Sequence, residues 1–243
     1  MPRGVTKDAL FDGALTLFQP ARGYRVNIDA LLLAAFAARG RRARRAIDLG
    51  AGVGAVGLSL LYMRAASHVD FVEREPLLAR LAGQNLEAGG FAGNVLVADL
   101  ALGLPKSLRQ SADLVVANPP YFHPHAGRPR AQQIERDART GAIEPFVAAA
   151  ARALDGVRAR AVFVYPARAL EQLLRASAES KLVAKRLRLV HARADAEARL
   201  ALVELRQARP GGMVVEPPLF EWIAPGKRAP ELSALVGRTG DRR

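Results

Sequence analysis

The sequence contains no cysteine in its 243 residues, which excludes disulfide bonds and thiolate metal ligands. Histidine is also scarce, and the pair His123 and His125 lacks a third ligand at a suitable spacing, so we expect no metal site. The longest apolar run, residues 30–38, is too short to cross a bilayer, and the N-terminus lacks the basic-then-apolar pattern of a secretion signal. We therefore expect a soluble, cytoplasmic protein with no membrane partner.

Acidic residues are few relative to basic ones. Lysine and arginine number 36 against 23 aspartate and glutamate residues, which gives a formal net charge of +13. A GC-rich genome would explain why arginine outnumbers lysine, but it would not explain the excess of positively charged residues over negatively charged ones. An arginine-rich surface attracts polyphosphates over a long range, so the charge favours nucleic acid as a partner.

Most of the chain alternates between apolar strand-like runs and helical segments. We expect a helix from Asn27, its N-cap, to residue 39, and strands at 68–73, 94–99 and 159–165, each followed or preceded by a helix or turn. This alternation predicts βαβ units in a doubly wound, mostly parallel sheet. Two long strand-like runs near the C-terminus predict an antiparallel hairpin at one edge of that sheet.

No internal repeat or low-complexity linker divides the chain, so a single domain spanning residues 1–243 is the simplest interpretation. Within it we expect an N-terminal turn or hairpin at 1–26, a βαβ core at 27–180, a C-terminal hairpin with a closing strand at 181–225, and a tail at 226–243.

A glycine-rich turn follows the first core strand, in the stretch AIDLGAGVGAVG at residues 46–57. Its glycines, Gly50, Gly52, Gly54 and Gly57, include a GxGxxG pattern that is also typical of dinucleotide-binding turns. Asp48 favours another ligand, because a carboxylate beside the turn repels the pyrophosphate of a dinucleotide. The same carboxylate attracts the ammonium and sulfonium groups of S-adenosylmethionine.

Two further acids stand at the ends of the next strands. Glu73 ends the second strand, 21 residues beyond Gly52, and is placed to accept both ribose hydroxyls of such a cofactor. Asp99 ends the third strand and is suited to accept the amine of the adenine ring, although an acid there can also simply cap a helix. Ligands of open α/β sheets bind beyond the carboxyl ends of the strands, so the pattern predicts a site for S-adenosylmethionine.

The fourth core strand stops at Asn118, Pro119, Pro120 and Tyr121, a tetrapeptide that continues neither a strand nor a helix. The side-chain oxygen of Asn118 and the carbonyl of Pro119 can accept the two hydrogens of a planar amine and aim its nitrogen at a methyl donor. Tyr121 offers a face on which a planar target stacks, and Phe122 extends that wall. A proline-rich turn that merely ends the strand is the alternative.

These motifs resemble the class I S-adenosylmethionine-dependent methyltransferases that act on amino nitrogens. Within that class, residues 18–36 and the C-terminal stretch from the hairpin to EPPLFEW are similar to the bacterial tRNA(Val) adenine-N6 methyltransferases. The resemblance implies a Rossmann-like, seven-stranded sheet and methylation of adenine N6 at nucleotide 37, beside the anticodon of a tRNA. It also implies that Gly23, Tyr24, Arg25 and Asp29 flank the cofactor pocket, and a structural latch is the alternative for an arginine and a tyrosine in such a glycine-led turn.

Two basic stretches are candidates for RNA contact. The long polar loop at residues 122–142 overhangs the expected active edge, and we expect it to order on RNA through Arg128, Arg130, Arg136 and Arg139. The RGRRARR stretch at residues 39–45 enters the sheet at the opposite edge, where solvation and RNA binding are equally compatible with the sequence.

Other functions fit part of this evidence. The same tetrapeptide serves a protein glutamine-N5 methyltransferase, but such enzymes usually carry an extra N-terminal helical domain. A guanine-N2 RNA methyltransferase, a DNA adenine methyltransferase or a noncatalytic RNA-binding module are further alternatives. The positive charge and the intact acids favour an enzyme that methylates adenine N6 in tRNA, and we expect it to be monomeric.

Overall fold

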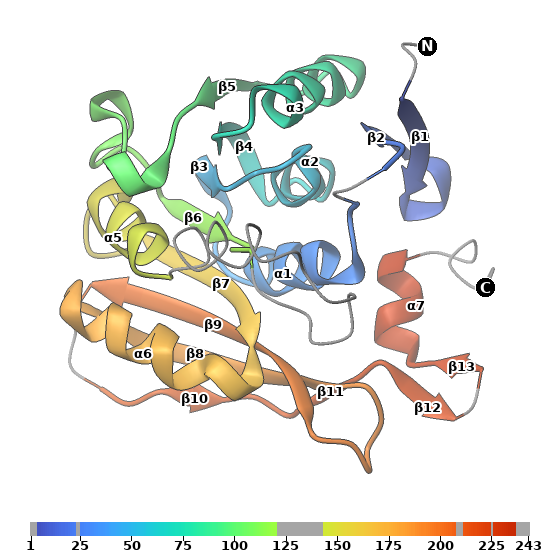
Figure 1. The fold of residues 1–243 in the computed structure, drawn as a ribbon. Coiled ribbons are helices and arrows are strands. Elements are labelled where there is room, and N and C mark those ends of the chain that lie inside the picture. Colours follow the sequence, from blue (N-terminus) through green and yellow to red (C-terminus); the bar gives the residue numbers. More distant parts are fainter. Residues whose placement is uncertain (1–3, 23–24, 121–142, 208–210, 225, 237–243) are drawn as a thin grey trace, which may run out of the picture.

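The computed structural model describes residues 4–22, 25–120, 143–207, 211–224 and 226–236 (Figure 1). The strands are β1 Val5–Leu10, β2 Leu15–Pro20, β3 Ala43–Leu49, β4 Ala66–Glu73, β5 Gly93–Val97, β6 Leu114–Ala117, β7 Arg160–Pro166, β8 Leu182–His191, β9 Ala198–Gln207, β10 Val214–Val215, β11 Leu219–Phe220, β12 Trp222–Ala224 and β13 Lys227–Arg228. The α-helices are α1 Ile28–Ala38, α2 Ala55–Tyr62, α3 Pro76–Ala88, α5 Glu144–Ala153, α6 Leu170–Glu179 and α7 Pro230–Val236.

The main sheet has the order β10-β8-β9-β7-β6-β3-β4-β5, with β11 pairing beside β10 on β8. Strands β3 to β7 are parallel, and β9 runs antiparallel to both β7 and β8. Seven strands of this sheet correspond to the seven that the resemblance implied, and the two-residue strands β10 and β11 extend it to nine. The Rossmann-like fold and the antiparallel C-terminal hairpin are thereby confirmed.

The sheet is covered on both faces. Helices α1, α2 and α3 pack on one face with an apolar cluster that includes Leu33 and Phe71, and α5 and α6 cover the other face with a cluster that includes Val147 and Phe163 (Figure 1). Burial on both sides explains why the central strands are almost continuously apolar; every residue of β7 is buried. No helix among the described residues is long and apolar enough to span a membrane.

A β-hairpin of β1 and β2 precedes the core, within the segment where we expected a turn or hairpin. The fully buried side chain of Asn85 on α3 fixes this hairpin, because it accepts from Phe18 N at 2.6 Å and donates to Phe18 O at 2.9 Å. The same amide donates to the carbonyl of Val53 in the glycine turn at 2.9 Å. One side chain therefore joins the N-terminal hairpin, α3 and the glycine turn.

The C-terminal segment is more structured than a tail. Helix α7 lies within residues 226–243 and is held to β8 by a two-pronged ion pair between Arg188 and Glu231, at 2.6 and 2.8 Å. Leu232 is buried in the core. The sequence did not predict this helix, because the apolar stretch around Leu232 is too short to show a helical period. The partner of Glu231 on β8, Arg188, is also 43 residues away in the sequence.

Arginines of the RGRRARR stretch lie at the amino edge of the sheet, as the topology predicts. Arg45 pairs with the buried Asp70 at 2.6 Å and Arg39 pairs with Glu216 at 2.9 Å, so both have structural partners. Arg41 and Arg42 are exposed.

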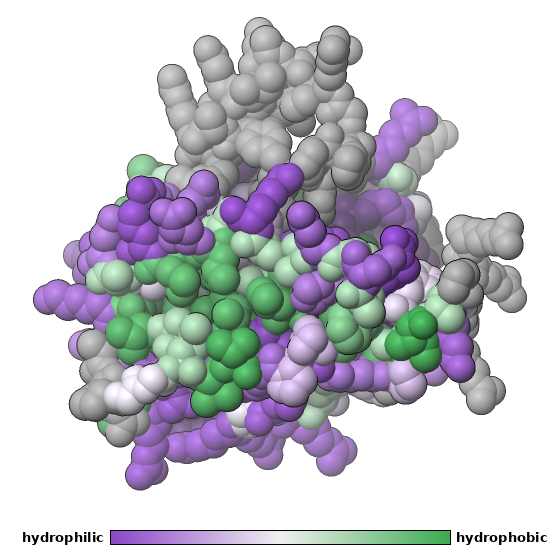
Figure 2. Space-filling model, turned by 90° about the horizontal axis from the view of Figure 1, so that it is seen from below, coloured by the Kyte–Doolittle hydropathy of each residue, from purple (hydrophilic) through white to green (hydrophobic). Residues whose placement is uncertain are grey.

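The outer edge of the sheet carries exposed apolar side chains. Met213, Val214 and Val215 on and beside β10 are exposed by 40%, 61% and 60%. Strand β10 lies at the lower edge in Figure 1, and the view from below in Figure 2 shows an apolar area on that face.

Candidate active site at the carboxyl edge of the sheet

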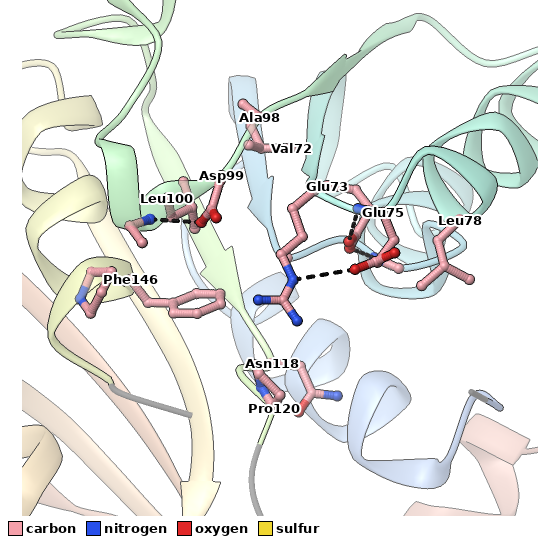
Figure 3. A pocket seen from close by; sticks show the side chains of 15 residues that line it. Val72, Glu73, Glu75, Leu78, Ala98, Asp99, Leu100, Asn118, Pro120 and Phe146 are labelled. Carbon is pink, nitrogen blue, oxygen red and sulfur yellow. Dashed lines mark hydrogen bonds and ion pairs between the residues drawn. The ribbon is translucent and has the colours of Figure 1, made fainter. Parts of the chain in front are cut away.

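A cavity of about 430 Å³ lies beyond the carboxyl ends of the central strands (Figure 3). Six of the residues that the sequence marked as cofactor-binding or catalytic line it: Gly50, Gly52, Glu73, Asp99, Asn118 and Pro120. Glu73 is the last residue of β4, and the others follow the ends of β3, β5 and β6, which lie beside one another and β4 in the sheet. The topology therefore brings together residues separated by up to seventy positions in the sequence.

The glycine turn needs glycine for two separate reasons. Gly50, Gly52 and Gly54 have φ values of 68°, 58° and 89°, in the left-handed region that favours glycine. A Cβ at Gly50 would also lie 2.8 Å from the Phe146 ring on α5. Gly57 serves packing, because a Cβ there would lie 2.4 Å from the Phe71 ring of β4.

Gly50→Ala is expected to lower the free energy of unfolding by about 2–4 kcal/mol, from left-handed strain and overpacking against Phe146 together. Gly83→Ala is the matched control, since Gly83 lies inside α3 and a Cβ added there would have its nearest neighbouring atom 3.9 Å away. That control should be neutral or stabilise by up to about 1 kcal/mol. Chemical denaturation measures both, and equal stabilities would contradict the packing argument.

Glu73 holds the turn in shape. Its Oε2 accepts from Gly52 N at 2.7 Å, its Oε1 accepts from Glu75 N at 2.9 Å, and the side chain is nearly buried. Each carboxylate oxygen has a further lone pair, so both can also accept a hydrogen bond from a ligand hydroxyl. This geometry fits the ribose diol of the expected cofactor.

Asp48 lies behind the turn and is only 1% exposed. Its Oδ2 accepts from Gly57 N at 2.9 Å in the first turn of α2. Burial, with a smaller contribution from the charge of Glu73, raises the pKa of Asp48 to about 7, although the Gly57 bond opposes the shift. Two acids thus stand close together behind the glycines, and a bound cation would relieve their repulsion.

We expect binding of a cationic cofactor to depend on pH through Asp48. A positive ligand favours the carboxylate, so affinity should rise with pH, by at most tenfold per unit, and level off above about 7. Without ligand, the raised pKa means that protonated Asp48 stabilises the fold fully below about pH 4, and this stabilisation is lost as pH rises through about 7.

Calorimetry of donor binding in buffers of different ionisation enthalpy should detect a proton released from Asp48 near pH 6. Asp48→Asn should abolish that release, and an unchanged release would contradict the assignment.

Asp99 lies two residues beyond β5 and is exposed. Its Oδ1 accepts from Ala101 N at 2.9 Å and caps a short 3₁₀ helix, Leu100–Leu102. The capping role that we considered for this acid is therefore present, and its contact with the adenine amine remains a prediction.

The cavity walls are mostly apolar and were not identified from the sequence. Leu78 of α3, Leu100 and Phe146 contribute apolar surface (Figure 3), and the charged residues Arg74 and Glu75 also line the cavity. Apolar walls with acids at one end suit a ligand that has a flat heterocycle and a polar sugar. The residues present therefore fit S-adenosylmethionine.

Asn118 and Pro120 enter the cavity directly after β6 (Figure 3). Pro119 between them is buried. Tyr121, Phe122 and the loop arginines Arg128, Arg130, Arg136 and Arg139 lie outside the described residues, and so do Gly23, Tyr24, His123 and His125. The roles expected of them remain predictions.

Two residues that the resemblance placed beside the cofactor have other partners and do not line the cavity. Arg25 pairs with Asp8 of β1 at 2.6 Å. Asp29 is buried at the start of α1 and pairs with Arg199 of β9 at 2.9 Å. The Arg25 pair connects the segment before α1 to β1, and the Asp29 pair connects the first turn of α1 to β9, so both are positioning roles.

A family model described as "Methyltransferase small domain" matches residues 27–156. Curated relatives are named tRNA1(Val) (adenine(37)-N6)-methyltransferase. The protein from Porphyromonas gingivalis W83 is 29% identical over 216 residues, which covers 86% of this chain and 83% of the relative. The protein from Aeromonas hydrophila is 32% identical over 185 residues, which covers 74% of this chain and 76% of the relative.

Solved structures share the fold. A structure described as a predicted O-methyltransferase from Agrobacterium tumefaciens matches with a TM-score of 0.65 at 22% identity, covering 84% of this chain and 93% of its own. A 16S rRNA N2 G1207 methyltransferase from T. Thermophilus, solved with AdoMet and guanosine, matches with a TM-score of 0.56 at 22% identity. That match covers 84% of this chain and 50% of the other.

Proposed function

Because this chain belongs to the methyltransferase small domain family and uses S-adenosylmethionine as its methyl donor, we propose that it methylates the N6 amine of an adenine in tRNA. The observation that carries the proposal is the position of Asn118, which lines the same cavity as Glu73 and Gly52. The names of the curated relatives support tRNA as the substrate class and adenine N6 as the acceptor.

The chain's part in the reaction is to orient the acceptor amine. Its lone pair is delocalised into the ring, so the free amine is a poor nucleophile. The Asn118 amide oxygen and the Pro119 carbonyl oxygen accept its two hydrogens, favour a pyramidal nitrogen and direct the lone pair into the cavity. When bound, the donor would supply the methyl group by breaking its bond to the sulfonium sulfur, and the amine nitrogen would lose one proton to water after the N–CH3 bond has formed.

The residues of the glycine turn orient the donor from the other side. Glu73 holds the amides of Gly52 and Glu75 and offers both oxygens to the ribose. The negative charges of Glu73 and Asp48 favour a cationic donor. A product without the sulfonium charge would be held less strongly by these two acids, although its ammonium group would keep part of the attraction.

The experiment that tests the proposal is methyl transfer from labelled S-adenosylmethionine to unmodified tRNA, followed by nucleoside mass spectrometry. We expect N6-methyladenosine as the labelled nucleoside. N2-methylguanosine would instead indicate a guanine-N2 methyltransferase, and label confined to protein glutamine would indicate a glutamine-N5 methyltransferase. Donor binding without any transfer to RNA or protein would contradict the enzyme assignment.

A further inference from the structure

An aromatic and basic surface lies beside the β8 edge of the main sheet, on strands β11, β12 and β13 and on the turn after β8. We call it the β12–β13 surface and define it by Arg193, Phe220, Trp222, Lys227 and Arg228. The guanidinium of Arg228 lies over the ring of Trp222, 5.2 Å from its centroid. Lys227 is exposed, and the Arg193 side chain is 61% exposed. Phe220 and Trp222 are half-buried.

The strand register places this surface at the same edge of the sheet as the active site. Ala117, the last residue of β6, is level with Phe163 of β7, and β7 ends at Pro166, three residues further along. Pro166 pairs with Leu200 of β9, and Leu200 pairs with Val190 of β8. Val190 in turn pairs with Leu219 of β11. Residues from Phe220 onward therefore extend beyond the carboxyl edge, as Asn118 to Pro120 do.

Four strand spacings separate β6 from β11, through β7, β9 and β8. At about 4.8 Å per spacing, the lateral separation is about 19 Å. A nucleic acid whose target base lies in the cavity would reach this surface with nucleotides near the target, but a single nucleoside would not.

The surface is rigidly connected to the sheet. Glu221 N donates to His191 O at 2.9 Å, and Trp222 N donates to Ala192 O at 3.0 Å. Arg199, which also pairs with the buried Asp29 of α1, forms an ion pair with Glu221. The ordering cost of binding is therefore small, because the aromatic and basic groups are already held in place.

We propose that the β12–β13 surface binds the RNA strand flanking the target nucleotide, an inference that rests on the proposed function. Lys227 contacts backbone phosphates, and Arg228, stacked on Trp222, presents a flat cation to a base or a phosphate. Arg193 adds charge, although Asp195 pairs with it at 3.1 Å. The mixture of exposed cations with aromatic rings matches single-stranded RNA, which offers phosphates and unstacked bases together.

The test compares two variants that each remove two positive charges. Lys227→Ala with Arg228→Ala alters the surface, and Arg41→Ala with Arg42→Ala removes exposed arginines at the opposite edge of the sheet. Affinity for unmodified tRNA is measured at several salt concentrations. We expect the first variant to bind about tenfold more weakly, with a salt slope smaller by about 1.4–1.8. The second variant should bind as the wild type does.

Two further measurements make the result specific. Donor affinity should be unchanged in the Lys227/Arg228 variant, and its thermal unfolding should stay cooperative with at most a small loss from the Arg228–Trp222 contact, which separates RNA contact from misfolding. Arg228→Lys should recover the salt slope but only part of the affinity, because the charge remains and the flat stacking group is lost.

Equal tRNA affinity in the wild type and the Lys227/Arg228 variant would overturn the inference. An equal loss of tRNA affinity in both double variants would also overturn it, because that result would show only an effect of net charge. Failure of the proposed function is scored separately, by the absence of N6-methyladenosine from wild-type reactions. A wild type that methylates tRNA, with a Lys227/Arg228 variant that binds it normally, would refute this surface alone.

Discussion

Replacing Asn118 with alanine is expected to reduce the rate of methyl transfer by at least about 10²–10³-fold, while donor affinity stays within a few fold. The alanine removes one of the two oxygens that hold the amine, and loss of one positioned group of this kind costs about that much in rate. Donor affinity should persist because Asn118 stands at the acceptor end of the cavity, after β6, whereas Glu73 and Gly52 are on β4 and the glycine turn. Single-turnover rates and calorimetry with the donor measure the two quantities separately.

Two comparison variants sharpen this prediction. Asn118→Asp keeps an acceptor oxygen at the same position, so it should retain more activity than the alanine variant. Asn94→Ala deletes the same amide at the opposite end of the sheet, where Asn94 donates to Asp70 at 2.8 Å, and should leave the rate unchanged. Turnover retained by Asn118→Ala would end the proposed role of the tetrapeptide.

The sequence was sufficient to predict that Gly52, Glu73 and Asn118 line one cavity, although Arg25 and Asp29, which were also expected beside it, do not line it. Gly52, Glu73 and Asn118 follow three different strands, and the carboxyl ends of parallel strands share one edge. Once the alternation of strands and helices indicated a parallel sheet, their proximity followed from topology. No other contact had to be known to place Asn118 at this edge.

The apolar walls of the cavity could not be predicted in the same way. Leu78 belongs to the apolar stripe of α3, and Phe146 is an ordinary apolar residue near the start of α5. A residue of this kind looks the same in a sequence whether it faces the core or a cavity. Only the packing of α5 against Gly50 shows that the Phe146 ring reaches the site.

Long-range polar pairs were equally hidden. The carboxylate of Asp29 finds its partner, Arg199, 170 residues away, and Asn85 bonds to the N-terminal hairpin 67 residues away. A buried polar group requires partners, but the sequence does not say which ones. A polar residue on an otherwise apolar helix face, as Asn85 is between Ala82 and Leu86, is the one signal that marks such a position.

Glu73→Ala is expected to weaken donor binding by at least about 100-fold, equivalent to about 2.7 kcal/mol. The change removes both acceptors of the proposed ribose contact and releases the backbone amides of Gly52 and Glu75. The buried amide of Gly52, left without a partner, favours a rearranged turn, which adds to the loss. Calorimetric titration with the donor measures the affinity, and assays at saturating donor measure whether the maximal rate is better preserved.

Glu73→Gln keeps the size and shape of the side chain but removes its negative charge, so it separates the contributions of the two to donor binding. A glutamine oxygen can accept one of the two backbone amides, but its NH₂ group faces the other as a second donor, so we expect intermediate affinity. Glu87→Ala removes an equal charge from an exposed position at the end of α3 and should change affinity little. If Glu73→Ala bound the donor as tightly as the Glu87 variant, the acid would have no role in the site. If the two glutamate-73 variants were equally weak, the negative charge rather than the bonding geometry would dominate donor recognition.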